Sequence, residues 1–106
     1  IFAVEKQTGG GLLEKLVDGY REQMKEKLEM LASAAKHDDV KMLYSSAHAI
    51  KSMSSNIGAE KVRLISAGIE KNAKVGIVTN LARDVADLEL ANNDFLTAIS
   101  ELLHPD

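Results

Sequence analysis

The stretch Tyr44–Val62, YSSAHAIKSMSSNIGAEKV, joins an apolar stripe at helical spacing to a glycine that can end a helix. The stripe advances by three or four residues at a time through Ala47, Ile50, Ser54 and Ile57. Gly58 can take the left-handed conformation with which many helices end. The stretch therefore predicts a helix, a tight turn and the start of a second helix that packs back against the first.

The same spacing continues in both directions and predicts four helices. They are expected from about Leu12 to Ala35, from Val40 to Ile57, from near Ala59 to about Ala73, and from about Ile77 to Leu103. The connections are short: KHDD at residues 36–39, with Asp38 or Asp39 as N-cap, and KVG at residues 74–76. Short connections make neighbouring helices antiparallel, so the predicted fold is an all-α, antiparallel, up-down four-helix bundle.

The apolar stripes of the other three helices complete the predicted core. Their members are Leu13, Leu16, Val17, Tyr20, Met24, Leu28, Leu31 and Ala35, then Val62, Ile65, Ile69 and Ala73, and finally Val78, Leu81, Val85, Leu88, Phe95, Ile99 and Leu102. The 106 residues suit one domain. Within it, residues 1–11 are expected to form an N-terminal segment, with a short extra helix as an open alternative, and residues 12–103 the bundle.

Composition excludes several classes of function. Hydrophobic residues make up 45% of the chain and aromatic residues 4%, so the core must be aliphatic. A net charge of −3 argues against nucleic acid as a partner. The absence of cysteine removes disulfides, zinc thiolates and cysteine nucleophiles, and it fits a cytoplasmic chain. No apolar run approaches the roughly 18 residues of a membrane span, so no membrane contact is expected.

His48 lies about 100° around the predicted helix from Ala47, away from the centre of the apolar stripe. The side of the helix that carries it also carries Tyr44, Lys51, Ser52 and Ser55. Serine and alanine occupy most of the neighbouring positions, so the imidazole is expected to protrude where a partner can approach it.

The turn at Gly58 suggests a partner for His48 on the next helix. If Gly58 and Ala59 are the pivot of an antiparallel hairpin, His48, eleven residues before Ala59, lies level with Glu70, eleven residues after it. A carboxylate beside an imidazole can accept the Nδ1 proton and leave Nε2 as a nucleophile. Lys51, and Lys74 one turn beyond Glu70, could offer positive charge to an anion. No metal-ligand set is found, because only His48 is well placed.

The stretch AHAIKSMSSNIGA resembles the core motif of histidine-containing phosphotransfer (HPt) domains. The motif is carried here by Ala47, His48, Ile50, Lys51 and Ser52, by the pair Ser54-Ser55, and by Ile57, Gly58 and Ala59. The helical layout, with the histidine on the second of four long helices, extends the resemblance to nearly the whole chain. Ser52 stands where glycine is most frequent in that family.

The resemblance implies that His48 accepts a phosphoryl group from the aspartyl phosphate of a response-regulator receiver domain and passes it to another receiver. Lys51 would neutralise phosphoryl charge, and Glu70 would orient the imidazole. The resemblance also implies a receiver-docking surface, formed by Ala47, Ser52, Ser55 and Lys74. It implies in addition that Gly58 is the helix-ending glycine.

The same resemblance implies a phosphocarrier rather than a complete enzyme. The domain itself would need no cofactor, since the receiver would bring the Mg²⁺, and it would be monomeric in isolation. Because the sequence starts without methionine, it is expected to be the C-terminal module of a hybrid sensor histidine kinase, in the cytoplasmic part of that protein.

Other interpretations of the same residues stay open. A helical adaptor without catalytic function could bind a partner through the rim formed by Ala47, the edge of Ile50 and Met53. Glu70 and Lys74 could be an ordinary surface pair one turn apart. The dimerisation domain of a histidine kinase is disfavoured, because Ala49 stands where that domain has an acidic residue and the second helix lacks proline. His37 and His104 have no comparable setting.

Overall fold

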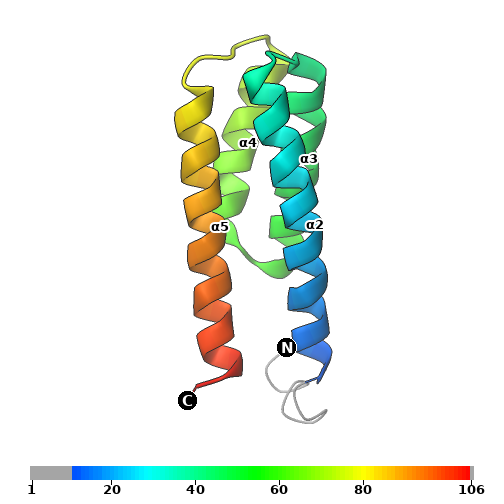
Figure 1. Cartoon of the computed structure of the whole chain (residues 1–106), viewed down its shortest axis with the longest axis vertical. Coiled ribbons are helices and arrows are strands. Elements are labelled where there is room, and N and C mark those ends of the chain that lie inside the picture. The colour runs from blue at the N-terminus through cyan, green and yellow to red at the C-terminus, as the bar shows by residue number, and fades with distance from the viewer. Residues whose placement is uncertain (1–10, 106) are drawn as a thin grey trace.

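The computed structural model describes residues 11–105, which form four antiparallel helices joined by short turns. They are α2 (Gly11–Lys36), α3 (Val40–Ile57), α4 (Glu60–Lys74) and α5 (Leu81–Leu103) (Figure 1). The chain runs up and down through them in order, so the predicted four-helix bundle is confirmed. The extra N-terminal helix considered from the sequence falls on residues 1–10, outside the described part of the chain.

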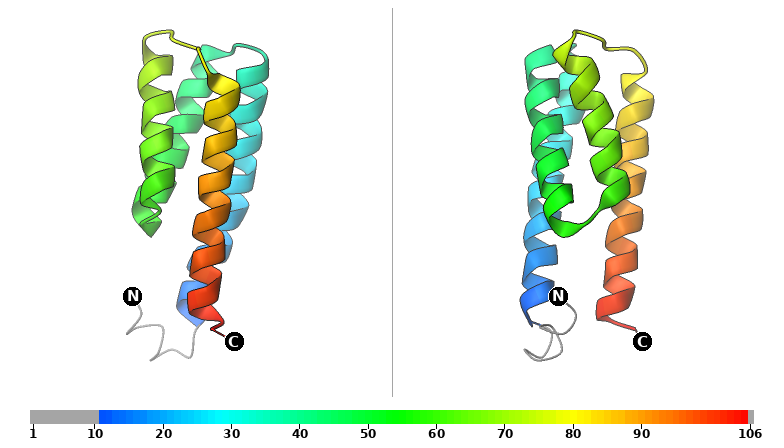
Figure 2. Two further views of the ribbon diagram at one scale, coloured as in Figure 1. Left: turned by 90° about the vertical axis from the view of Figure 1, so that its left-hand side faces the viewer. Right: turned by 180° about the vertical axis from the view of Figure 1, so that it is seen from behind.

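The helices are arranged as a ring in which each contacts the helix before it and the helix after it. Close approaches join α2 to α3, α3 to α4, α4 to α5, and α5 back to α2; within residues 11–105 neither diagonal pair comes as close. The helices α2 and α5 have 26 and 23 residues, whereas α3 and α4 have 18 and 15. Figure 2 shows the result: α2 and α5 extend well beyond the turn between α3 and α4.

Local side-chain chemistry sets both ends of α3. Asp39 is the N-cap, and its side chain accepts a hydrogen bond of 3.1 Å from the backbone N–H of Met42. Gly58 ends the helix with φ at 82°, in the left-handed region. The N–H of Ala59 then donates to the carbonyl of Ser54 at 2.8 Å, which closes a Schellman turn. Two choices made from sequence, Asp39 as one candidate N-cap and Gly58 as helix end, are confirmed.

The start of α5 differs from the prediction by four residues. The helix was expected from about Ile77, but it begins at Leu81. Gly76 and Asn80 both have positive φ, at 75° and 62°, so the chain between them turns instead of continuing a helix. Val78 nevertheless packs against the core from this connection. The sequence pattern therefore identified a core residue but assigned it to the wrong element.

The core is aliphatic, as the composition predicted. Its fully buried large side chains are Met24, Leu31, Leu43, Ile50, Leu88 and Val62. Leu16 and Leu102 were predicted for the core but are 52% and 62% exposed. Both lie toward the end of the molecule where α3 and α4 no longer cover α2 and α5. Leu16 instead lines an apolar groove of about 470 Å³ beside Ile57.

Candidate functional site

His48 lies near the middle of α3 and projects from the bundle. Its side chain is 55% exposed, whereas the neighbouring core residues Ala47 and Ile50 are fully buried. One helical step of about 100° separates His48 from Ala47, so adjacent residues have opposite environments. The partial exposure of His48 agrees with the sequence prediction.

Glu70 on α4 meets the imidazole from the neighbouring helix. Its Oε2 lies 2.5 Å from Nδ1 of His48, and the residue as a whole is only 8% exposed. An ionised carboxylate can only accept a hydrogen bond, so the N–H of Nδ1 is the donor and keeps its proton. In a neutral ring the lone pair is then on Nε2. The contact between His48 and Glu70, predicted from the position of the turn, is confirmed.

Lys51 occupies the second oxygen of the same carboxylate. Its Nζ lies 2.5 Å from Oε1 of Glu70, and its side chain is 34% exposed. The prediction placed Lys51 near a phosphoryl group and did not foresee this ion pair. Each oxygen of Glu70 thus holds one group from α3, and the three side chains form one connected cluster.

The environment keeps Glu70 ionised. Burial raises the pKa of its carboxyl group, but the hydrogen bonds from Lys51 and His48 together outweigh burial and leave the pKa below the ordinary value of 4.5. At neutral pH, Glu70 is therefore a carboxylate held in a largely buried position, able to stabilise positive charge that develops on the imidazole.

Tyr44 lies beside the imidazole in an offset-stacked arrangement. Its ring and that of His48 are nearly parallel, at 12° between planes, with 6.1 Å between centroids. The helical spacing of the sequence places Tyr44 on the same side of the helix, but no role was predicted for it. The signal that could have revealed the contact is the spacing of four residues, at which helical side chains meet.

The remaining predicted site residues differ in where the structure places them. Ser52 and Ser55 are exposed on α3, as a docking surface requires, and Lys74 is exposed at the end of α4. Within residues 11–105, Lys74 makes no ion pair, so the alternative of a Glu70–Lys74 surface pair is wrong.

Ala47 cannot belong to a docking surface. It is 0% exposed, because the apolar stripe of α3 turns it into the core. The prediction that Ala47 belongs to the receiver-docking surface is therefore wrong. The predicted exposed rim of Ala47 and Ile50 is wrong for the same reason, because Ile50 is also fully buried.

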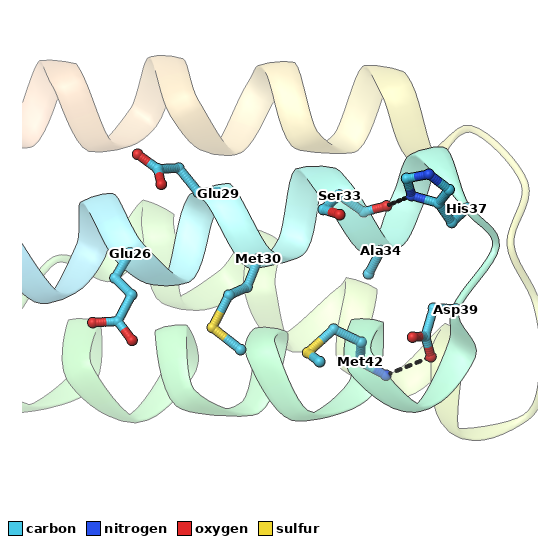
Figure 3. A pocket seen from close by; sticks show the side chains of 8 residues that line it. All are labelled: Glu26, Glu29, Met30, Ser33, Ala34, His37, Asp39 and Met42. Atoms are coloured by element: carbon cyan, nitrogen blue, oxygen red, sulfur yellow. Dashed lines mark hydrogen bonds between the residues drawn. The ribbon is translucent and has the colours of Figure 1, made fainter.

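The other two histidines lie in different surroundings. His37 lies in the turn after α2, and its Nδ1 bonds to the carbonyl of Ser33 in the last turn of that helix at 2.8 Å, beside a cavity of about 520 Å³ between α2 and α3 (Figure 3). His104 approaches Glu14 at 3.6 Å where both side chains are largely exposed. In the described part of the chain, no three side chains of His, Cys, Asp or Glu form a group that could hold a metal.

Comparison with known proteins gives one family. A family model described as "Hpt domain" matches residues 15–104, which is most of the chain and includes His48, Lys51 and Glu70. Neither a curated protein nor a solved structure matches the chain. Among the described residues, no helix is long and apolar enough to cross a membrane.

Proposed function

The chain belongs to the Hpt domain family, with a histidine phosphotransfer role in phosphorelay signalling, and we propose that His48 is its phosphoacceptor. The single observation that supports this most strongly is the bond between Nδ1 of His48 and the buried carboxylate of Glu70. In the neutral ring this leaves the lone pair on Nε2, on the side of the ring away from Glu70. Neither His37 nor His104 combines an exposed ring with a buried carboxylate.

The proposed donor is the aspartyl phosphate of a receiver domain, since Hpt domains interact with receivers. Nε2 attacks the phosphorus, a bond from nitrogen to phosphorus forms, and the bond from phosphorus to the aspartyl oxygen breaks. The leaving carboxylate takes the electron pair of that bond. The imidazole keeps its Nδ1 proton and becomes positively charged, which Glu70 stabilises across 2.5 Å. Transfer to a second receiver reverses these steps.

Little else is required of this domain, because phosphoryl transfer depends mainly on position and charge. Lys51 lies one turn from His48 and contributes positive charge beside the incoming phosphoryl group. We assign the Mg²⁺ of the reaction to the receiver. Ser52 and Ser55, exposed and small, are proposed as part of the surface on which the receiver docks, with Lys74 at its edge.

The test is transfer from a ³²P-labelled receiver domain in the presence of Mg²⁺. Wild-type protein should acquire label that acid removes and base does not, as expected for phosphohistidine. His48→Gln should acquire none, whereas His37→Gln and His104→Gln should be labelled normally. Label that persists in His48→Gln, or wild-type protein that binds receivers without ever becoming labelled, would reject the proposal; the second result would favour the adaptor interpretation.

Lys51→Ala separates a role in transfer from a role in folding. We expect transfer to slow about fivefold, because one partly exposed charge contributes about 1 kcal/mol. The helical signal by circular dichroism should stay unchanged. Loss of that signal would show that Lys51 acts through stability alone.

A further inference from the structure

The bond to Glu70 holds the His48 imidazole at one point only. Its covalent attachment through Cβ and a single hydrogen bond from Nδ1 to Oε2 restrain the ring, but small rotations of the side-chain torsions can still tilt the ring plane. In-line attack needs more than this, because the lone pair of Nε2 lies in the ring plane and must point at the phosphorus. A second contact that fixes the plane is therefore needed, and the structure contains one.

Tyr44 supplies that contact from the same helix. Side chains in a helix lean toward its N-terminus, so His48 leans over the turn that carries Tyr44. The two rings are nearly parallel at 12°, and 6.1 Å between centroids is within the range of offset-stacked pairs. A stacked ring opposes rotation of its neighbour out of the shared orientation, which the hydrogen bond to Glu70 does not do.

The surroundings of the ring are different on its two sides. Toward the N-terminus of α3, the ring of Tyr44 lies beside the imidazole. Toward the C-terminus, the residues one turn from His48 are Lys51, whose ammonium group is bound to Glu70, and Ser52, which is small and exposed and whose side chain makes no hydrogen bond within the described residues. Ser52 therefore leaves more room for a partner beside the imidazole than the larger Tyr44 does.

We propose that Tyr44 is a positioning residue for phosphotransfer, which holds the plane of the His48 imidazole so that Nε2 faces a donor arriving over Ser52. This inference rests on the proposed function of His48. Tyr44 forms no bond to the phosphoryl group and exchanges no proton. It raises the fraction of molecules in which the ring is ready to attack, and the observed rate scales with that fraction.

Two substitutions test the proposal. Tyr44→Phe keeps the stacking ring, whereas Tyr44→Leu keeps apolar bulk without a ring. We expect Tyr44→Phe to transfer phosphate at the wild-type rate. Tyr44→Leu should be slower by about two- to tenfold at saturating receiver, the factor that corresponds to the usual strength of an aromatic pair. Lys41→Ala, an exposed change one turn earlier on α3, is the matched control and should have no effect.

The concentration of receiver at half-maximal rate separates positioning from docking. If Tyr44 only contacts the receiver, Tyr44→Leu raises that concentration and leaves the saturated rate unchanged, which would overturn the proposal. A nuclear Overhauser contact between the two rings, measured by NMR without any receiver, should be present in wild type and Tyr44→Phe. Its absence from wild type would also overturn the proposal.

The same experiment separates failure of this inference from failure of the proposed function. Unlabelled wild-type protein refutes both, because Tyr44 can position His48 for transfer only if His48 is the acceptor. Labelled wild-type protein with an unimpaired Tyr44→Leu refutes the role of Tyr44 alone.

Discussion

Glu70 holds the imidazole of His48 with one carboxylate oxygen and the ammonium group of Lys51 with the other. Both partners come from α3, so the carboxylate also ties the two helices of the hairpin together. A charge in so buried a position is tolerated only when it is well paired. The arrangement therefore links the stability of the hairpin to the ionisation of a residue that also contacts the proposed phosphoacceptor.

Glu70→Gln tests this link through its pH dependence. Because the folded-state pKa of Glu70 is below its ordinary value of 4.5, the carboxylate stabilises the fold above pH 4.5, and this stabilisation is lost as pH falls through the lowered pKa. Urea unfolding should show the variant less stable at pH 7 by about 1–3 kcal/mol, with the difference shrinking below pH 4.5. Glu89→Gln, an exposed change on α5, is the control. A difference that stays constant down to pH 3 would contradict the prediction.

At the scale of single residues, the sequence predicted one side-chain contact of the site and missed two others. The pairing of His48 with Glu70 followed from counting residues away from Gly58, because an antiparallel hairpin fixes which residues are level. The ion pair of Lys51 and the stacking of Tyr44 depend on rotamers, which residue spacing permits but does not select. Ala47 was misassigned because the motif contains both exposed and buried positions, and sequence likeness does not separate them.

The hairpin of α3 and α4 owes its register to the turn at Gly58. The turn is short and closed by the bond from Ala59 to Ser54, so a change in its length by one residue would rotate α4 by about 100° relative to α3. Glu70 would then leave His48. The geometry of the site is thus set by the backbone of a turn at Gly58, which lies ten residues from His48 and twelve from Glu70 in the sequence.

Two glycine substitutions should have opposite effects on stability. Gly58→Ala places a side chain at φ 82°, in the left-handed region, and should cost about 1–2 kcal/mol. Gly68→Ala lies inside α4 with no atom within 4 Å of the added Cβ, and should stabilise by up to about 1 kcal/mol. Urea or thermal unfolding followed by circular dichroism measures both. Equal effects of the two substitutions would show that backbone conformation does not distinguish these sites.

The sequence predicted helix ends wherever local chemistry sets them. Asp39 and Gly58 could be recognised because an N-cap carboxylate and a left-handed glycine act within a few residues. The start of α5 could not, because Ile77 and Val78 continue the apolar spacing through a connection whose direction depends on Asn80 in the left-handed region. Asparagine tolerates that conformation but does not require it.

In the whole molecule, α2 and α5 close the ring of helices and continue past α3 and α4 (Figure 2). The periodicity of apolar residues was enough to predict the bundle. It did not predict which apolar residues of α2 and α5 are exposed beyond the ends of the shorter helices α3 and α4. The contact between α2 and α5 that closes the ring includes a hydrogen bond. The hydroxyl of Tyr20 on α2 donates to Oδ1 of Asn92 on α5 at 2.8 Å, and the two residues are 72 positions apart in the sequence. Both residues are buried, and burial raises the pKa of Tyr20 to about 12, so its hydroxyl stays a donor at neutral pH.

Breaking this bond should destabilise the bundle without touching the phosphotransfer site. Tyr20→Phe leaves Oδ1 of Asn92 buried without this donor, and Asn92→Leu leaves the hydroxyl without its acceptor; each should cost about 1–3 kcal/mol in urea unfolding. The double variant should cost less than the sum of the two, because it leaves neither group unpaired.

Transfer to His48 should proceed at the wild-type rate in all three variants at temperatures where they are folded, since α3 and α4 carry every residue of the site. Additive costs in the double variant would show that Tyr20 and Asn92 stabilise the fold independently. A slower transfer in a fully folded variant would show that closure of the ring by α2 and α5 controls the geometry of the α3–α4 hairpin, and the site would then be a property of the whole bundle.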